Sequence, residues 1–301
     1  MIGRVATFAL SNSMIDAALL TQAKVAEKQM QSASGLISSD YGGLGGATSQ
    51  KVLSLQVSLT QSQAYSDAAS SANDRVQVMY STTGSIVDLL NNFKSTLTSS
   101  VSATGTDADT LQDTAASALS DLASLLNTQY GGRYLFAGSA TETAPVDLSN
   151  YSATSTSSVD TSYYQGNSDL ASVRVSGSRT ITYGVTADNS AFEQAMRAIS
   201  SIANGGTIDN DIISSALDQT TKAIDSVIGV QTQLSLTSSQ LERSIDVQTD
   251  FQDAASTVSS SLTEVDVAAV TAQLTTYQSQ LEASYAAISK IQGLSLVNYL
   301  S

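Results

Sequence analysis

Both ends of the chain are expected to be long helices, because apolar residues recur there at steps of three, four or seven. A narrow apolar stripe of this kind packs on another helix. Chain ends usually fray, so we expect these two to pack on each other and on neighbouring copies, as in a polymer subunit. The stripes comprise Val5, Phe8, Ile15, Leu19, Ala26, Ala33 and Leu36 at one end, and Val267, Val270, Leu274, Tyr277, Leu281, Ile288 and Ile291 at the other.

The stripes are the candidate functional surface, and we interpret them as a self-assembly seam. Tyr277 and Tyr80 lie on apolar stripes, so we expect them in the core rather than in a ligand site. The residues of the predicted seam are Phe8, Ile15, Leu19, Val270, Leu274, Tyr277, Leu281, Ile288 and Ile291.

The composition leaves little room for catalysis. The chain has no Cys, His or Trp, which excludes disulfides, thiol chemistry, His-ligated zinc and Ser–His catalysis. The closest carboxylates, Glu264 and Asp266, stand at a break between two stripes, where capping of a helix start explains them. We therefore predict no enzyme activity, no cofactor and no metal site.

The charge balance also restricts the partners. The 301 residues include 13 Lys and Arg against 27 Asp and Glu, which gives a net charge of 13 − 27 = −14. Such a surface repels phosphate groups and anionic lipid, so we expect neither nucleic acid nor a membrane as a partner. The longest apolar runs are too short to span a membrane.

A long stripe predicts one helix from about residue 47 to 102, after a Gly-rich connector between Gly35 and Gly46. At 1.5 Å per residue, this helix would be roughly 80 Å long and must lie along other helices. Ser62, Asn73 and Thr83 fall in the stripe and would help to fix its register. The apolar members are Val52, Leu55, Leu59, Ala69, Val76, Tyr80, Val87, Leu90, Leu97 and Val101.

The next stripe predicts an antiparallel helix, capped by Thr106 or Asp107 and ended by Gly131-Gly132. A short strand near Arg133 and a hairpin with a type II′ turn at Gly177-Ser178 follow. Helix resumes near Ala191. The final long stripe begins after Asp209 and breaks at residues 263–266 before the terminal helix; it contains Ile213, Leu217, Ile224, Val227, Leu234, Leu241 and Ile245.

These elements predict a mainly α fold: an elongated antiparallel helical bundle or coiled-coil rod made from both chain ends, with one small β insertion. We expect terminal helices over residues 1–46 and 256–301, and a helical rod over 47–145 and 190–255. Residues 146–189 would form a small outer domain that contains the β-hairpin.

Several segments resemble the bacterial flagellin superfamily, and in particular its members at the junction between hook and filament. The most specific segment is GGRYLFAGSATETAPV, from Gly131 to Val146. The segments YYQGN and SAFEQAMRAI, at 163–167 and 190–199, resemble that family's β insertion and its return to helix. The last 21 residues and the stretch that leads into SGLISSD resemble its terminal helices. Two departures are the absence of a proline after Asp40 and a short middle region.

The resemblance implies a structural, non-enzymatic subunit of the flagellar axial assembly, most similar to the junction proteins. It implies extracellular location on the flagellum after type III export without a cleaved signal peptide. The implied partners are a ring or polymer of the chain itself, neighbouring hook-associated and flagellin subunits, and a flagellar export chaperone. The terminal helices of the family order on assembly.

Two alternatives stay open at this point. The main flagellin of the filament shares the terminal helices but usually lacks the RYLFAG-type segment. A secreted coiled-coil translocator or needle-tip protein would share the helical ends and the lack of cysteine, but not that segment.

Overall fold

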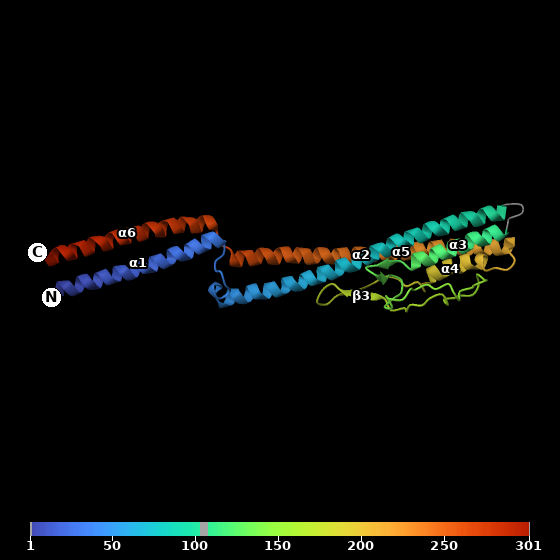
Figure 1. Cartoon of the computed structure of the whole chain (residues 1–301), viewed down its shortest axis with the longest axis horizontal. Coiled ribbons are helices and arrows are strands. Elements are labelled where there is room, and N and C mark those ends of the chain that lie inside the picture. Colours follow the sequence, from blue (N-terminus) through green and yellow to red (C-terminus); the bar gives the residue numbers. More distant parts are fainter. Residues whose placement is uncertain (1, 103–107, 301) are drawn as a thin grey trace. The chain divides into compact units, whose positions relative to one another are not determined.

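The computed structural model describes residues 2–102 and 108–300, which form two compact units (Figure 1). The first unit consists of Met1–Thr60 and Gln252–Ser301, and the second of Gln61–Phe251. The long helices α2 (Gly46–Ser102) and α5 (Asn210–Thr263) contribute residues to both units. The predicted domain boundaries after residues 46, 145, 189 and 255 stay a prediction.

The first unit is built around two antiparallel helices, α1 (Ile2–Ser34) and α6 (Val267–Leu300), which lie side by side (Figure 1). Asp266 caps α6, since its Oδ1 accepts the N–H groups of Ala268 and Ala269 at 2.9 and 3.1 Å. This is the capping role that the break between the stripes predicts. A short 3₁₀ helix, η1 (Gly42–Leu44), lies between α1 and α2.

The segment after α1 is tied to the α5–α6 joint by a small antiparallel bridge, which we call the linker bridge. The N–H of Ile37 donates to the carbonyl of Thr263 at 2.7 Å, and the N–H of Val265 donates to that of Gly35 at 2.9 Å. Gly35 has φ 72°, a left-handed conformation that glycine adopts without strain and that turns the chain out of α1. Two segments more than 220 residues apart in sequence are therefore joined through their backbones.

Replacing Val265 by Pro is expected to open the linker bridge, because proline has no N–H to donate to Gly35. The lost hydrogen bond corresponds to about 0.5–1.5 kcal/mol. Amide hydrogen exchange at Ile37 should become faster, since its partner carbonyl is in the same bridge. Val265→Ala keeps the N–H and should leave that exchange rate unchanged; equal rates in the two variants would contradict the prediction.

In the second unit, α2 and α5 pack through the stripes that their sequences predict. Val76, Leu90 and Leu97 of α2 and Val227 and Leu241 of α5 are fully buried. Tyr80 is a correction, because 40% of its surface is exposed. An apolar stripe marks the side of a helix that faces its neighbours, but Tyr80 lies at the edge of that side and stays partly open to solvent.

Polar side chains cross the contact between α2 and α5 at two levels. Ser238 Oγ donates to Asn73 Oδ1 and accepts from Gln77 Nε2, each at 2.7 Å. Closer to the start of α2, Ser62 Oγ lies 2.9 Å from Gln248 Oε1. Because each group has a specific partner, these contacts favour one register of the two helices over its neighbours.

Two shorter helices, α3 (Ala108–Leu126) and α4 (Ser190–Ala203), pack on each other in this unit (Figure 1). A tiny hairpin of β1 (Gln129–Tyr130) and β2 (Arg133–Tyr134) follows α3, with Gly131 and Gly132 at φ 59° and 76°. The prediction that this Gly pair ends the helix is wrong. The pair forms a hairpin turn, and α3 ends earlier, at Leu126. The predicted cap at Thr106 or Asp107 lies outside the described residues.

The second hairpin pairs β3 (Ala171–Arg174) with β4 (Thr180–Tyr183), as predicted. Its turn is not of type II′, because Gly177 does not have a positive φ. The hydroxyl of Ser176 accepts the N–H of Arg179 at 3.1 Å instead and closes the turn. Apart from this turn type, the fold class is confirmed as mainly α with one small β insertion.

A buried ion pair on α4 holds the irregular segment before the hairpin. Arg197 and Glu193 are both buried, with Nε and Oε1 2.8 Å apart. Arg197 also donates to the carbonyl of Thr156, and Glu193 Oε1 accepts the N–H of Asp160 at 3.0 Å. One ion pair therefore satisfies backbone groups at two points of the same segment.

Two tyrosines complete this packing. The hydroxyl of Tyr163 donates to the carbonyl of Ala187 at 2.9 Å, and its ring meets that of Tyr151 edge to face at 5.2 Å. Burial raises the pKa of both tyrosines above the usual value, so both stay protonated at neutral pH. Phe136, from the RYLFAG segment, is fully buried against Phe192 of α4, which makes this segment a structural corner.

The exposed faces of the long helices are rich in hydroxyl groups that bond to their own backbone. Ser58, Thr60 and Thr98 on α2 and Thr249 and Thr257 on α5 each donate to the carbonyl four residues earlier, at 2.8–3.0 Å. These hydroxyls are satisfied inside their own helix. Within residues 2–102 and 108–300, no helix has the combination of length and hydropathy that a bilayer span requires.

Candidate assembly surface

The candidate surface is the pair formed by α1 and α6. Ser32 and Thr271 bring their hydroxyl oxygens to 3.3 Å, and Lys24 Nζ lies 5.5 Å from the centre of the Tyr277 ring. The second contact is a cation–π interaction, which contributes about 0.5–1 kcal/mol at an exposed site. Together they set the antiparallel register of the two helices.

The C-terminal residues of the predicted seam lie on the covered side of α6. Val270 is buried, at 5% exposure. The others are half-buried: Leu274, Tyr277, Leu281, Ile288 and Ile291. One neighbouring helix covers only part of this stripe, as expected for a pair of helices without a third. The role of these residues in self-assembly stays a prediction.

The N-terminal residues of the predicted seam are placed differently. Ile15 and Leu19 are 37% and 58% exposed, so α6 leaves much of both side chains uncovered within one chain. Their packing on neighbouring copies stays a prediction. The side chain of Phe8 is outside the described part of the structure. The covered side of α1 begins one position earlier in the heptad and comprises Met14, Ala18, Thr21, Val25 and Lys28.

This shift leaves a second apolar stripe on α1, which we call the outer α1 stripe. Its members are exposed and keep heptad spacing: Ile15, Leu19, Ala26, Met30 and Ala33. Met30 is 65% exposed and was not part of the predicted seam, although it follows Ala26 by one helical turn. Large apolar side chains in a row on one exposed helix face are typical of a protein contact.

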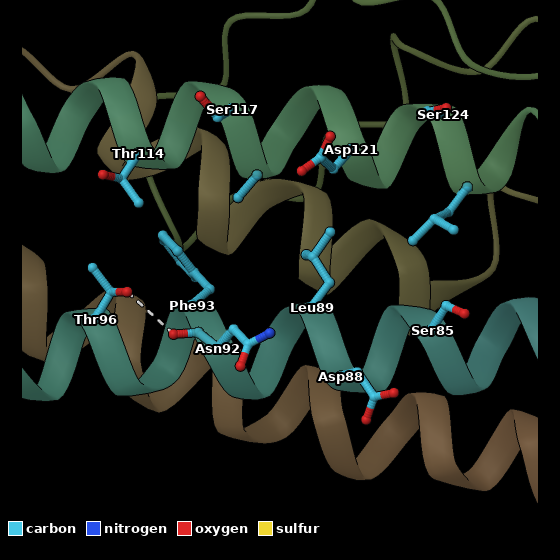
Figure 2. Close-up of a pocket in the computed structure, with 12 residues that line it drawn as sticks. Ser85, Asp88, Leu89, Asn92, Phe93, Thr96, Thr114, Ser117, Asp121 and Ser124 are labelled. Atoms are coloured by element: carbon cyan, nitrogen blue, oxygen red, sulfur yellow. Dashed lines mark hydrogen bonds between the residues drawn. The ribbon is translucent and has the colours of Figure 1, made fainter.

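The described residues contain no group of three or more Asp, Glu, His or Cys side chains that could hold a metal ion. A groove in the second unit lies between α2 and α3 (Figure 2). Its floor is apolar and its margins carry hydroxyls, without an activated nucleophile or base.

Comparison with known proteins finds relatives among flagellar proteins. Residues 217–300 match the bacterial flagellin C-terminal helical region. The chain is 25% identical to flagellar hook-associated protein 3 of Escherichia coli (strain K12) over 280 residues, which cover 83% of this chain and 84% of that protein.

Two solved structures share the fold. One is a protein from Vibrio parahaemolyticus described as flagellar hook-associated, with a TM-score of 0.59 and 18% identity; the match covers 71% of this chain and 96% of that one. The other is Bacillus cereus FlgL, with a TM-score of 0.57 and 14% identity over 68% of this chain and 98% of that one. None of these relatives is described as an enzyme, in agreement with the prediction of a non-catalytic chain. The chain thus resembles the bacterial flagellin superfamily, as its sequence predicts, and within that superfamily it resembles flagellar hook-associated protein 3.

Proposed function

We propose that the chain is a structural subunit of the bacterial flagellum at the junction between hook and filament. The similarity to flagellar hook-associated protein 3 supports this role and extends over most of both chains. The observation that carries the proposal is the outer α1 stripe, an exposed apolar row beside the row of α1 that already packs on α6. A subunit of an assembly needs such a second surface, and a finished monomer does not.

In this proposal, neighbouring copies cover the outer α1 stripe. Burial of a large apolar side chain stabilises by about 1.5–3 kcal/mol, so Ile15, Leu19 and Met30 together contribute several kcal/mol per contact. Ordering the terminal helices costs about 1–2 kcal/mol of conformational entropy per residue. The α1–α6 contact alone therefore leaves the folded ends only marginally stable. Assembly would therefore stabilise the folded ends by mass action.

The proposed partners follow from the same role. They are further copies in a ring or polymer, adjacent hook-associated and flagellin subunits, and a flagellar export chaperone before secretion. The proposed location is extracellular, on the flagellum, reached by type III export without a cleaved signal peptide. The predicted terminal, rod and outer domains would then be the inner, middle and exposed parts of the assembled subunit.

Leu19→Asp tests the proposal in cells that lack the wild-type chain. A charge in a buried apolar contact is costly, so this variant should be made and folded but absent from isolated flagella, with loss of motility. Ser13→Asp adds the same charge on another side of α1 and should be incorporated normally. Normal incorporation of Leu19→Asp would contradict assembly through the outer α1 stripe.

The number of copies per flagellum separates the junction from the filament. Immunogold labelling of the chain should give a single short zone between hook and filament. Label along the whole filament would favour the main flagellin instead, and label absent from flagella would contradict both roles.

A further inference from the structure

The turn between β3 and β4 is a positive point on an acidic protein. Residues 170–187 contain Arg174 and Arg179 and no Asp or Glu, whereas the whole chain has a net charge of −14. Arg174 donates from Nε to the carbonyl of Ser176 at 3.1 Å, and from Nη2 to that of Gly177. Arg179 is exposed beside it. The two guanidinium groups therefore stand at one end of the hairpin.

The turn is anchored at its base and open at its tip. Val175 is buried, and its carbonyl accepts Gln248 Nε2 of α5 at 3.0 Å. A Cβ atom added at Gly177 would have no neighbour within 4 Å among the described residues. A turn that is anchored at its base loses less conformational entropy than a free loop when it enters a partner.

The groove between α2 and α3 has complementary features. It is open to solvent and has a volume of about 610 Å³. Leu89, Ala118 and Leu125 form an apolar floor, and Asp88 and Asp121 stand on its two sides. Figure 2 shows Asp121 directed from α3 toward the gap between the helices. Helix α3 has three Asp residues and no Lys or Arg, so this side of the groove is acidic.

Among the described residues, the charged side chains of the turn and of the groove have no ion-pair partner. The ion pairs found in residues 2–102 and 108–300 are Lys28–Glu27 and Arg197–Glu193. The turn lies at the level of Gln248 and Ser62, whereas Leu89 of the groove is 27 residues further along α2. At 1.5 Å per residue this is about 40 Å. The two surfaces therefore cannot meet within one copy.

We propose that the β3–β4 turn of one copy docks into the α2–α3 groove of a second copy. Each copy would offer one turn and receive another on a different surface. Such a head-to-tail contact repeats from copy to copy and produces a ring or a helix. The contact rests on the proposed assembly of the chain and adds a second interface, in the second unit, to the one on α1.

Cysteine cross-linking tests the contact, because the natural chain has no Cys to interfere. Copies with Ser178→Cys at the turn and differently tagged copies with Ser124→Cys in the groove are expressed together, and isolated flagella are oxidised. A disulfide-linked pair that carries both tags is expected. Ser178→Cys with Ser235→Cys, on an exposed face of α5, is the matched control and should give no such pair.

Charge reversal gives an independent readout. Arg179→Glu and Asp121→Arg should each lower incorporation about tenfold or more, since each places like charges together. The double variant should restore incorporation. Circular dichroism of the purified variants checks that both exposed substitutions leave the fold intact.

The possible failures are distinguishable. Normal incorporation without the two-tag disulfide, or a double variant no better than the single ones, would overturn the turn–groove contact and leave the junction role standing. Absence of the wild-type chain from flagella would overturn the junction role and this contact with it.

Discussion

Removal of residues 268–301 is expected to abolish incorporation into flagella while the second unit stays folded. The deletion takes away almost all of α6, and with it the helix that covers Ala18 and Val25 of α1. Residues 61–251 have their own buried core, which includes Phe136, Leu241 and Ile199. Their thermal unfolding transition should therefore remain.

The measurement compares the truncated and complete chains by calorimetry and by immunoblotting of isolated flagella. Leu281→Asp is a milder version with the full length preserved, and it should also prevent incorporation, because Leu281 lies on the half-buried side of α6. Incorporation of the truncated chain at the wild-type level would show that α6 is dispensable for assembly.

The second large effect is expected from Arg197→Ala. Glu193 and Arg197 are 2% and 7% exposed, and removal of the arginine leaves a buried carboxylate without its counter-ion. Such losses cost about 3–5 kcal/mol. The substitution also removes the donor to Thr156, so the segment before the β-hairpin should become accessible to proteases.

Chemical denaturation and limited proteolysis measure the two consequences of Arg197→Ala. Arg243→Ala removes the same charge from an exposed position of α5 and should change the free energy of unfolding by less than about 0.5 kcal/mol. Similar denaturation midpoints for the two variants would mean that the buried ion pair does not stabilise the second unit.

The first helix shows where apolar periodicity stops being informative. Ile15 and Leu19 are each one residue after Met14 and Ala18, and both pairs fit the same heptad spacing. Spacing alone cannot select between two apolar rows on one helix. The covered row even includes the polar Thr21 and Lys28, so choosing the more apolar row led to the uncovered side.

The buried face of a helix could be predicted where the helix has only one apolar row. The stripe of α5 is buried or half-buried at every predicted position, and α2 extends over the predicted range within one residue. The conformation at the glycines is harder to predict from sequence. Gly131 and Gly132 are compatible with a helix end as well as with a hairpin turn. The turn at Gly177 is stabilised by the hydroxyl of Ser176, so its type does not follow from the position of the glycine.

The hydroxyls that bond back to their own helices have a consequence for assembly as a reversible process. A side chain already satisfied by its carbonyl gives up little hydration when another surface approaches. On α6, Thr271, Thr275 and Thr276 bond back to their own helix in the same way, and the stretch from Val267 to Leu281 contains no charged residue. In the proposed assembly, subunits with such faces would lose little bound water as they come together, and their association should depend only weakly on ionic strength along these faces.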